Sequence, residues 1–190
     1  PVERVVRARD LWNLIIKYAT RTAEPGLLMW DTIIRRSPAD AYAAQGFRTI
    51  CTNPCSEIPL SAYDSCRLTS LNLTGFVKNS FESNAEFDWS SFKESIGIAV
   101  RMLDNIVDID HDLQPFEEQR KSNSNGRRLG LGTHGLADTL VRLGKRYDDD
   151  DTIAFADKLY AFFKVEAYKA SIELAKERGI GADDLLKEQK

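Results

Sequence analysis

Apolar side chains recur at helical spacing in three long stretches of this chain. The first covers residues 2–22, and the strongest begins after Asp88, a residue type that favours helix N-caps, and continues to Val107. The third follows an acidic run at 148–151, which suits the positive end of a helix, and stops at Gly179. The pattern predicts three long amphipathic helices, each with one apolar face turned to a core.

Shorter apolar runs lie between these stretches. The run at 27–30 predicts a short buried strand and the run at 67–73 a strand of mixed burial, while 136–143 predicts a short helix. Residues 35–49 and 112–125 are polar and each contains a proline, so both are predicted to be loops. The alternation of strands and helices indicates an α/β architecture in which helix predominates.

The composition is ordinary for a globular protein and narrows the choice of partners. The chain has 190 residues, of which 43% are hydrophobic and 29% charged, with a formal charge of -3. This balance gives no reason to expect nucleic acid or an anionic membrane as a partner. No apolar run approaches the roughly 18 residues of a membrane span, and no leader-like segment opens the chain. We therefore expect a cytoplasmic protein.

The length suits one sizeable core, and the two ends carry a further expectation. The chain starts without a methionine inside a predicted helix, and it ends in the charged segment 181–190. We therefore expect a fragment of a longer polypeptide.

Three cysteines, Cys51, Cys55 and Cys66, lie close together in the sequence and are the only ones in the chain. An odd number of cysteines in a cytoplasmic chain disfavours a structural disulfide framework. A zinc site would need four ligands, and neither His111 nor His134 stands in a pair with ligand spacing. The sequence therefore predicts no metal site.

The loop 50–60 sets the Cys55 thiol between a neutral amide, Asn53, and a carboxylate, Glu57. Two prolines in the loop restrict its backbone without making helix or sheet. A nucleophilic thiolate needs a cation or base beside it, and the anionic Glu57 disfavours one. The arrangement suits a thiol that loses a hydrogen atom, while Glu57 accepts a proton from a substrate hydroxyl and Asn53 holds a hydroxyl without adding charge. The alternative is a polar surface loop around a buried structural cysteine.

A second candidate site is the G-x-G-x-x-G pattern from Gly130 to Gly135, which a predicted helix follows. A dinucleotide site also needs a hydrophobic strand immediately before the glycines, and residues 124–128 make a poor strand. The simpler interpretation is that the glycines allow close backbone packing at a tight turn. His134 in this turn is interpreted as a hydrogen-bonding or surface histidine.

Five segments, in order, resemble one enzyme family. Residues 53–57 resemble the active-site finger loop of the ribonucleotide reductase large (catalytic) subunit, and residues 64–73 resemble the segment that follows it, with the family's second redox cysteine. Residues 24–28, 99–105 and 126–132 are similar to further segments of the family. The resemblance covers almost the whole chain, and it explains the glycines without a dinucleotide.

The resemblance implies a fold and a domain boundary. Members of this family have a ten-stranded α/β barrel with the finger loop running through its centre. Residues 1–190 would be a helix-rich part of this catalytic barrel domain, with the finger loop at 50–60. The N-terminal region that binds ATP and other effectors, and the C-terminal portion of the barrel, would lie outside this chain, so the chain would not turn over alone.

The resemblance also implies a role for each site residue in reducing ribonucleotides to 2′-deoxyribonucleotides. Cys55 would form the transient thiyl radical that takes the 3′ hydrogen, Glu57 would accept the 3′-hydroxyl proton, and Asn53 would bind the sugar hydroxyls. Cys66 would be one of two thiols that end as a redox-active disulfide, with a partner outside this chain. Cys51 is expected to be a packing residue. The implied substrate-binding residues are Asn53, Pro54, Cys55, Ser56 and Glu57.

The resemblance further implies a radical source and partners. The form Asp-Ser-Cys-Arg-Leu at 64–68 favours the adenosylcobalamin-dependent branch, and the alternative is the aerobic branch with a separate metal-containing radical subunit. Thioredoxin or glutaredoxin would reduce the full enzyme, which would be a homodimer. Two other functions remain open: a nucleotide-binding, dehydrogenase-like module built on Gly130 to Gly135, and an inactive scaffold piece derived from a reductase.

Overall fold

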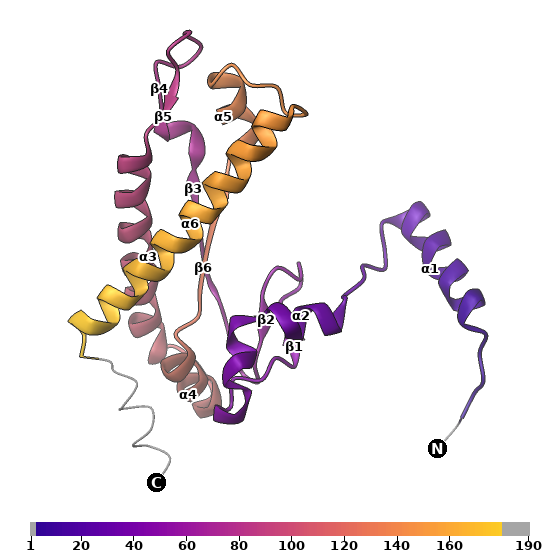
Figure 1. The fold of residues 1–190 in the computed structure, drawn as a ribbon. Helices are drawn as coiled ribbons and strands as arrows, with labels where there is room; N and C mark the ends of the chain where they lie inside the picture. The colour runs from indigo at the N-terminus through magenta and orange to yellow at the C-terminus, as the bar shows by residue number, and fades with distance from the viewer. Residues whose placement is uncertain (1–2, 180–190) are drawn as a thin grey trace. The chain divides into compact units, whose positions relative to one another are not determined.

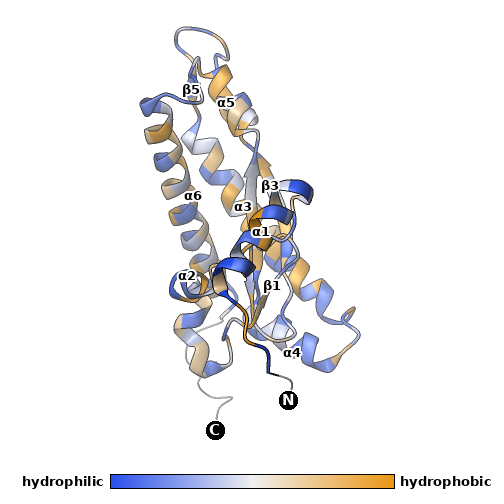
Figure 2. Ribbon diagram, turned by 90° about the vertical axis from the view of Figure 1, so that its right-hand side faces the viewer, coloured by the Kyte–Doolittle hydropathy of each residue, from blue (hydrophilic) through white to orange (hydrophobic). Residues whose placement is uncertain are grey.

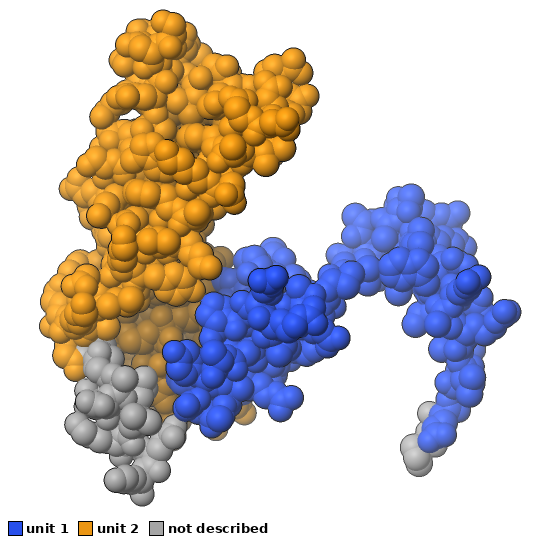
Figure 3. Space-filling view, in the orientation of Figure 1, with its two compact units in different colours: residues 1–62 blue, residues 63–190 orange. Residues whose placement is uncertain are grey.

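The chain divides into two compact units, Pro1–Ala62 and Tyr63–Lys190, each with its own internal contacts (Figure 3). The computed structural model describes residues 3–179. The charged segment 181–190 and the first residue of the helix expected at 2–22 lie outside the described residues. The two units are described in turn.

Short elements make up the first unit (Figure 1). The amphipathic helix expected at 2–22 is confirmed, although it begins only at Ala8, and the residues expected to form a loop at 35–49 include a 3-10 helix. Antiparallel β1 and β2 form a hairpin around the cysteine loop. The elements are α1 (Ala8–Thr22), α2 (Trp30–Arg36), η1 (Pro38–Gln45), β1 (Cys51–Thr52) and β2 (Pro59–Leu60).

The strand expected at 27–30 is wrong. Leu27, Leu28 and Met29 belong to no regular element, and Trp30 starts α2. All four side chains are exposed. A short apolar run has no periodicity that distinguishes a strand from a helix. None of the strands in residues 3–179 pairs with the run at 27–30.

A pair of long helices beside two parallel strands forms the second unit (Figure 1). Strand β3 lies parallel to β6, with Arg67 opposite Leu129 and Asn72 opposite His134. Helix α3 packs against α6 and against both strands. The elements are β3 (Arg67–Asn72), η2 (Leu73–Phe76), β4 (Val77–Lys78), β5 (Glu86–Phe87), α3 (Trp89–His111), α4 (Glu117–Gly126), β6 (Leu129–His134), α5 (Leu136–Arg142) and α6 (Asp150–Glu177).

The hydrophobic core of the second unit lies between α3, α6 and the strands. Phe92 is fully buried and its ring contacts the rings of Phe76, Phe87, Phe162 and Phe163. This contact network confirms the predicted apolar faces of both helices. The buried cluster comprises Leu73, Phe87, Phe92, Ile96, Val100, Leu159 and Leu174.

The predicted N-cap of α3 is confirmed. The Asp88 carboxylate accepts a hydrogen bond from the Ser91 backbone N–H at 3.1 Å and another from the Ser91 hydroxyl at 2.8 Å. It also pairs with Lys78 at 2.7 Å. The hydrogen bond from Lys78 has the largest influence on the Asp88 carboxylate. Together with the two from Ser91, it holds the pKa of Asp88 well below its usual range.

The loop expected at 112–125 is wrong, because α4 occupies most of it. This helix is hydrophilic along its length, so it carries no apolar period that would reveal it (Figure 2). It is fixed by a polar contact instead: buried Asn123 donates from Nδ2 to the Val107 carbonyl oxygen at 3.2 Å. Glu117 and Glu118 in its first turn complement the positive end of the helix.

The turn expected around Gly130 is also wrong, since Leu129–His134 is a strand. Of the three glycines in the G-x-G-x-x-G pattern, only Gly135, at the junction of β6 and α5, adopts a positive φ, 78°, that favours glycine. The dinucleotide interpretation fails on the same ground, because its glycines should follow a strand and here Gly130 and Gly132 lie inside one. In residues 3–179 no helix is both long and apolar enough to cross a membrane.

Candidate functional site

The loop that carries Cys55 is the tip of a two-stranded hairpin, which we call the cysteine hairpin (Cys51–Leu60). Cys51 lies opposite Leu60 in the antiparallel register. The Ser56 backbone N–H donates to the Asn53 carbonyl oxygen at 2.9 Å, so residues 53–56 form a tight turn. Asparagine at its first position and proline at its second favour this turn.

Asn53 holds the cysteine hairpin together with two hydrogen bonds to one residue. Its backbone N–H donates to the Ile58 carbonyl oxygen at 3.2 Å. Its side-chain Oδ1 accepts the Ile58 backbone N–H at 3.0 Å. Oδ1 is thus engaged within the hairpin, whereas the Nδ2 donor takes no part in these two hydrogen bonds.

The hairpin presents Cys55 and Glu57 to its surface, where both side chains are exposed. The interpretation of Cys55 as a buried structural cysteine is therefore wrong. Ser56 between them has φ 67°, a left-handed conformation that a serine adopts at a cost of about 1 kcal/mol. Cys51, expected to be a packing residue, is exposed as well, and its thiol donates to the Leu60 carbonyl oxygen at 3.8 Å.

Cys66 belongs to the second unit, immediately before β3, and is half-buried. Its thiol donates to the Arg67 carbonyl oxygen at 3.8 Å. Two ion pairs hold this start of β3: Asp64 with Arg128 at 2.6 Å, and Arg67 with Asp110. Both pairs are largely shielded from water, so they fix the backbone on either side of the thiol more firmly than surface pairs would.

The structure thus groups the predicted site residues into two sets. Asn53, Cys55 and Glu57 share the cysteine hairpin, whereas Cys66 lies on the strand scaffold of the other unit. Local turn chemistry holds the first set in place. Ion pairs and strand pairing hold Cys66.

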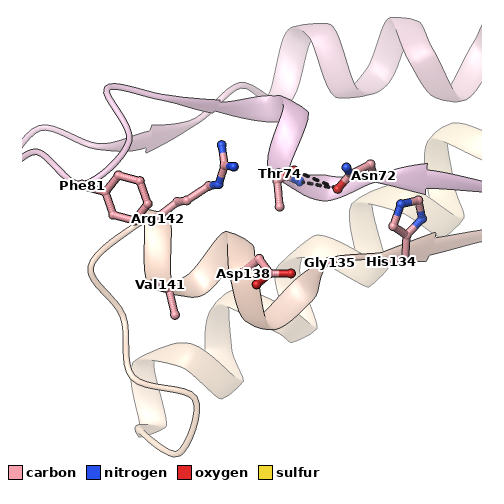
Figure 4. A pocket seen from close by; sticks show the side chains of 8 residues that line it. All are labelled: Asn72, Thr74, Phe81, His134, Gly135, Asp138, Val141 and Arg142. Atoms are coloured by element: carbon pink, nitrogen blue, oxygen red, sulfur yellow. Dashed lines mark hydrogen bonds between the residues drawn. The ribbon is translucent and has the colours of Figure 1, made fainter.

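A polar cavity of about 390 Å³ lies where the carboxyl ends of β3 and β6 meet (Figure 4). Asn72 and His134 stand at these two strand ends, and Asn72 accepts both the backbone N–H and the hydroxyl of Thr74. The expectation of a hydrogen-bonding His134 is confirmed, because its Nδ1 lies 2.9 Å from the Ser70 hydroxyl. No sequence motif predicted this cavity, although the carboxyl ends of parallel strands often lie at ligand sites.

Four charged side chains join α3 to the end of α4 and the end of α6. Arg127 donates to Asp104 at 2.7 Å and to Asp108 at 2.6 Å, and Arg178 contacts Asp104 at 2.7 Å and Asp108 at 2.5 Å. The hydrogen bond from Arg127 is the largest influence that lowers the pKa of Asp108 below its usual range. Each of these four side chains lies beside an opposite charge, so the network serves to hold α3, α4 and α6 together.

The described residues offer no ligand set for a metal ion or a corrinoid. Within residues 3–179, no group of three or more His, Cys, Asp or Glu side chains is placed to hold a metal ion. Both histidines of the chain are engaged by serine hydroxyls, His111 by Ser124 at 2.8 Å and His134 by Ser70. These residues do not by themselves fit an adenosylcobalamin site.

Comparison with known proteins identifies relatives of the whole chain. The family model described as "Ribonucleotide reductase, barrel domain" matches residues 2–185. The vitamin B12-dependent ribonucleoside-diphosphate reductase of Thermoplasma acidophilum is 35% identical over 175 residues, which are 92% of this chain and 22% of that protein. A Mycobacterium tuberculosis protein of the same name is 37% identical over 172 residues, covering 90% of this chain and 23% of its own length.

A further relative carries a different name. The ribonucleoside-diphosphate reductase subunit alpha of Chlamydia trachomatis is 33% identical over 180 residues, which are 92% of this chain and 16% of that protein. The chain thus spans roughly a fifth of the length of these curated relatives. The predicted helix-rich α/β fold is confirmed as part of a barrel domain. The chain belongs to the ribonucleotide reductase barrel-domain family.

Proposed function

We propose that this chain forms the part of a ribonucleotide reductase catalytic subunit that carries the finger loop and one redox cysteine. The observation that carries the proposal is the cysteine hairpin, which presents Cys55 and Glu57 together on a tip clamped by Asn53. A thiol and a carboxylate on one short, stiff loop can reach neighbouring atoms of a single ribose. The family relationship supports the same reaction.

In this proposal Cys55 acts as a thiyl radical and Glu57 as a base. The radical forms an S–H bond with the 3′ hydrogen of the ribose and leaves the unpaired electron on the 3′ carbon. Glu57 takes the proton of the 3′-hydroxyl, as a nearby carboxylate can. The 2′-hydroxyl then leaves as water with a proton from one of the two reducing thiols. At the end Glu57 returns its proton to the 3′ oxygen, and Cys55 returns the 3′ hydrogen to the 3′ carbon, which restores the thiyl radical.

Asn53 has a narrower role than the resemblance alone implies. Its Oδ1 accepts the Ile58 N–H and is therefore held within the hairpin. The Nδ2 group is then the part of the amide that donates to a ribose hydroxyl. A single rigid donor fixes the sugar without adding charge near the radical.

Cys66 supplies one of the two reducing thiols. Each thiol gives up one electron and one proton, and the two sulfur atoms join as a disulfide. One proton leaves in the water formed from the 2′-hydroxyl, and the other proton with the two electrons forms the new C–H bond at the 2′ carbon. The second thiol lies in a part of the enzyme outside this chain. Thioredoxin or glutaredoxin would then reduce the disulfide of the full enzyme.

The names of the relatives support finer assignments. Two of them are described as vitamin B12-dependent and all three as acting on ribonucleoside diphosphates. We extend both properties to the full enzyme, which would use adenosylcobalamin as its radical source and a ribonucleoside diphosphate as its substrate. Effector nucleotides, a homodimeric state and a cytoplasmic location belong to the same proposal.

The test uses the full-length enzyme with three single substitutions, Cys55→Ala, Glu57→Gln and Cys66→Ser. Deoxynucleotide formation should fall by at least about 1,000-fold for Cys55→Ala, because removing the group that performs a chemical step costs on the order of this factor. Cys51→Ser is the matched control, since Cys51 is an exposed thiol on the same hairpin. The catalytic proposal fails if deoxynucleotide formation survives all three substitutions, or if the control loses as much as Cys55→Ala.

A further inference from the structure

Gly130 lies where strand β6 passes closest to the Cys66 thiol. A Cβ added to Gly130 would stand 2.7 Å from Cys66 Sγ and 3.1 Å from the Arg67 carbonyl oxygen, and it would also collide with the Leu68 side chain. Real Cβ atoms essentially never approach a heavy atom closer than 3.0 Å. The hydrogen atom of a glycine is therefore what leaves room for the thiol.

The three neighbours of Gly130 differ in how far they can move. Leu68 is 63% exposed, so its side chain can rotate into solvent. The Arg67 carbonyl oxygen belongs to a backbone held by the ion pairs at the start of β3. Cys66 Sγ is the remaining atom that must shift, and it would have to retreat from 2.7 Å to at least 3.4 Å to reach ordinary contact.

Gly132 shows that this crowding is specific to one glycine of the strand. It lies two residues further along β6, on the same face as Gly130. A Cβ added there would have the Thr69 carbonyl oxygen as its nearest neighbour, at an ordinary 3.8 Å. Strand pairing alone therefore does not require glycine beside β3.

The geometry points to Gly130 as the positioning residue of the Cys66 thiol: by lacking a side chain, it lets the sulfur lie against β6 at the position from which it reduces the substrate. This inference rests on the proposed role of Cys66. The thiol is held between Gly130 and the Arg67 carbonyl oxygen, to which it donates at 3.8 Å. A displacement of about 1 Å at a reacting group can cost on the order of 100-fold in rate.

The test compares two double variants in the full-length enzyme. Leu68→Ala/Gly130→Ala removes the collision with the mobile leucine and leaves the collision with Cys66. Leu68→Ala/Gly132→Ala is the matched control, with the same two residue types changed on the same strands. Steady-state kinetics gives kcat and KM, and mass spectrometry after a single turnover of pre-reduced enzyme gives the fraction of Cys66 in a disulfide.

For the Gly130 variant we expect kcat to fall by about 10- to 100-fold, with KM within about twofold of the parent because the substrate-binding hairpin is unchanged. The single-turnover disulfide should fall in parallel with kcat. The control should keep both. Three outcomes would overturn the positioning role. The two variants could lose activity equally, the change could be confined to KM, or the Gly130 variant could fail to fold while the control folds.

Cys66→Ser separates this inference from the proposed function. If Cys66→Ser still makes deoxynucleotides, the proposed role of Cys66 is wrong and the positioning role falls with it. If Cys66→Ser abolishes turnover while Leu68→Ala/Gly130→Ala behaves like its control, only the role of Gly130 is wrong.

Discussion

The cysteine hairpin and the β3–β6 scaffold hold their thiols by different means. The hairpin consists of two strands of two residues each, and its shape depends on turn geometry and on the Asn53–Ile58 bonds. The scaffold pairs six residues of β3 with six of β6 and packs both strands against α3. Cys55 is accordingly exposed, whereas Cys66 is half-buried between fixed neighbours.

The difference matches the chemistry proposed for each thiol. A hydrogen-abstracting group must reach the substrate, so it belongs on a stiff projection. A reducing thiol must meet a second thiol at one position, so it benefits from a scaffold that allows little displacement. The two regions should therefore respond differently to mutation: the scaffold through global stability, the hairpin through local order.

The largest expected effect tests whether the scaffold depends on its aromatic core. Phe92→Ala should lower the free energy of unfolding by about 4 kcal/mol, since it removes a fully buried ring and leaves a cavity. Phe81→Ala is the control, because Phe81 is 71% exposed. Urea denaturation of the chain followed by circular dichroism measures both. Similar losses for the two would show that the core lies elsewhere.

The second prediction concerns the charged network behind the scaffold. Arg127→Ala should cost about 2 kcal/mol of unfolding free energy, because it leaves the buried Asp104 with one arginine partner fewer. The control is Arg146→Ala, whose arginine is 75% exposed and pairs with surface aspartates. Thermal unfolding of both variants checks the ranking, and a larger loss for Arg146→Ala would contradict it.

The third prediction is a pH dependence with a defined sign. The pKa of Asp88 is lowered in the folded chain by hydrogen bonds from Lys78 and Ser91. Its contribution is therefore present above the unfolded pKa of about 4 and is lost as the pH falls below that value. Asp88→Asn should show a smaller drop in melting temperature between pH 6 and pH 2.5 than the parent chain. Parallel curves for the two proteins would contradict the assignment.

The smallest effect is local to the hairpin. Asn53→Ala should speed hydrogen exchange of the Ile58 amide by about fivefold, the equivalent of one hydrogen bond worth about 1 kcal/mol, and should leave the amides of α3 unchanged. Asn53→Asp keeps the acceptor and removes the Nδ2 donor, so it should keep the protection. Exchange measured by NMR or mass spectrometry decides, and a change spread over α3 would show that the hairpin and the scaffold unfold together.

What the sequence predicted follows the same division. Strong apolar periods and caps predicted the long helices, because burial on one face determines them, as the Asp88 cap and the Phe92 contacts show. The polar helix α4 was missed because a tertiary contact, Asn123 with Val107, holds it. The run at 27–30 was misread because its side chains are not packed in either strand or helix form.

The candidate site was predictable as chemistry and not as geometry. The order of amide, thiol and carboxylate alone marks Asn53, Cys55 and Glu57 as candidate site residues. The sequence does not show that Ile58 donates to the Asn53 Oδ1 or that Gly130 lies beside Cys66, because both depend on how closely the backbone segments approach in the fold. The literal G-x-G-x-x-G pattern could not reveal that its first glycine faces a thiol.

The close approach of Gly130 and Cys66 also determines the register in which β3 and β6 pair during folding. Parallel pairing places Leu68 opposite Gly130, and both neighbours of this glycine in β6 are leucines. A slip of one residue would bring a leucine side chain to a place that has no room for a single added carbon. The absence of a side chain at Gly130 therefore favours the observed register of β3 and β6 over the registers shifted by one residue. The cost of a shifted register arises in folding, before any substrate is bound.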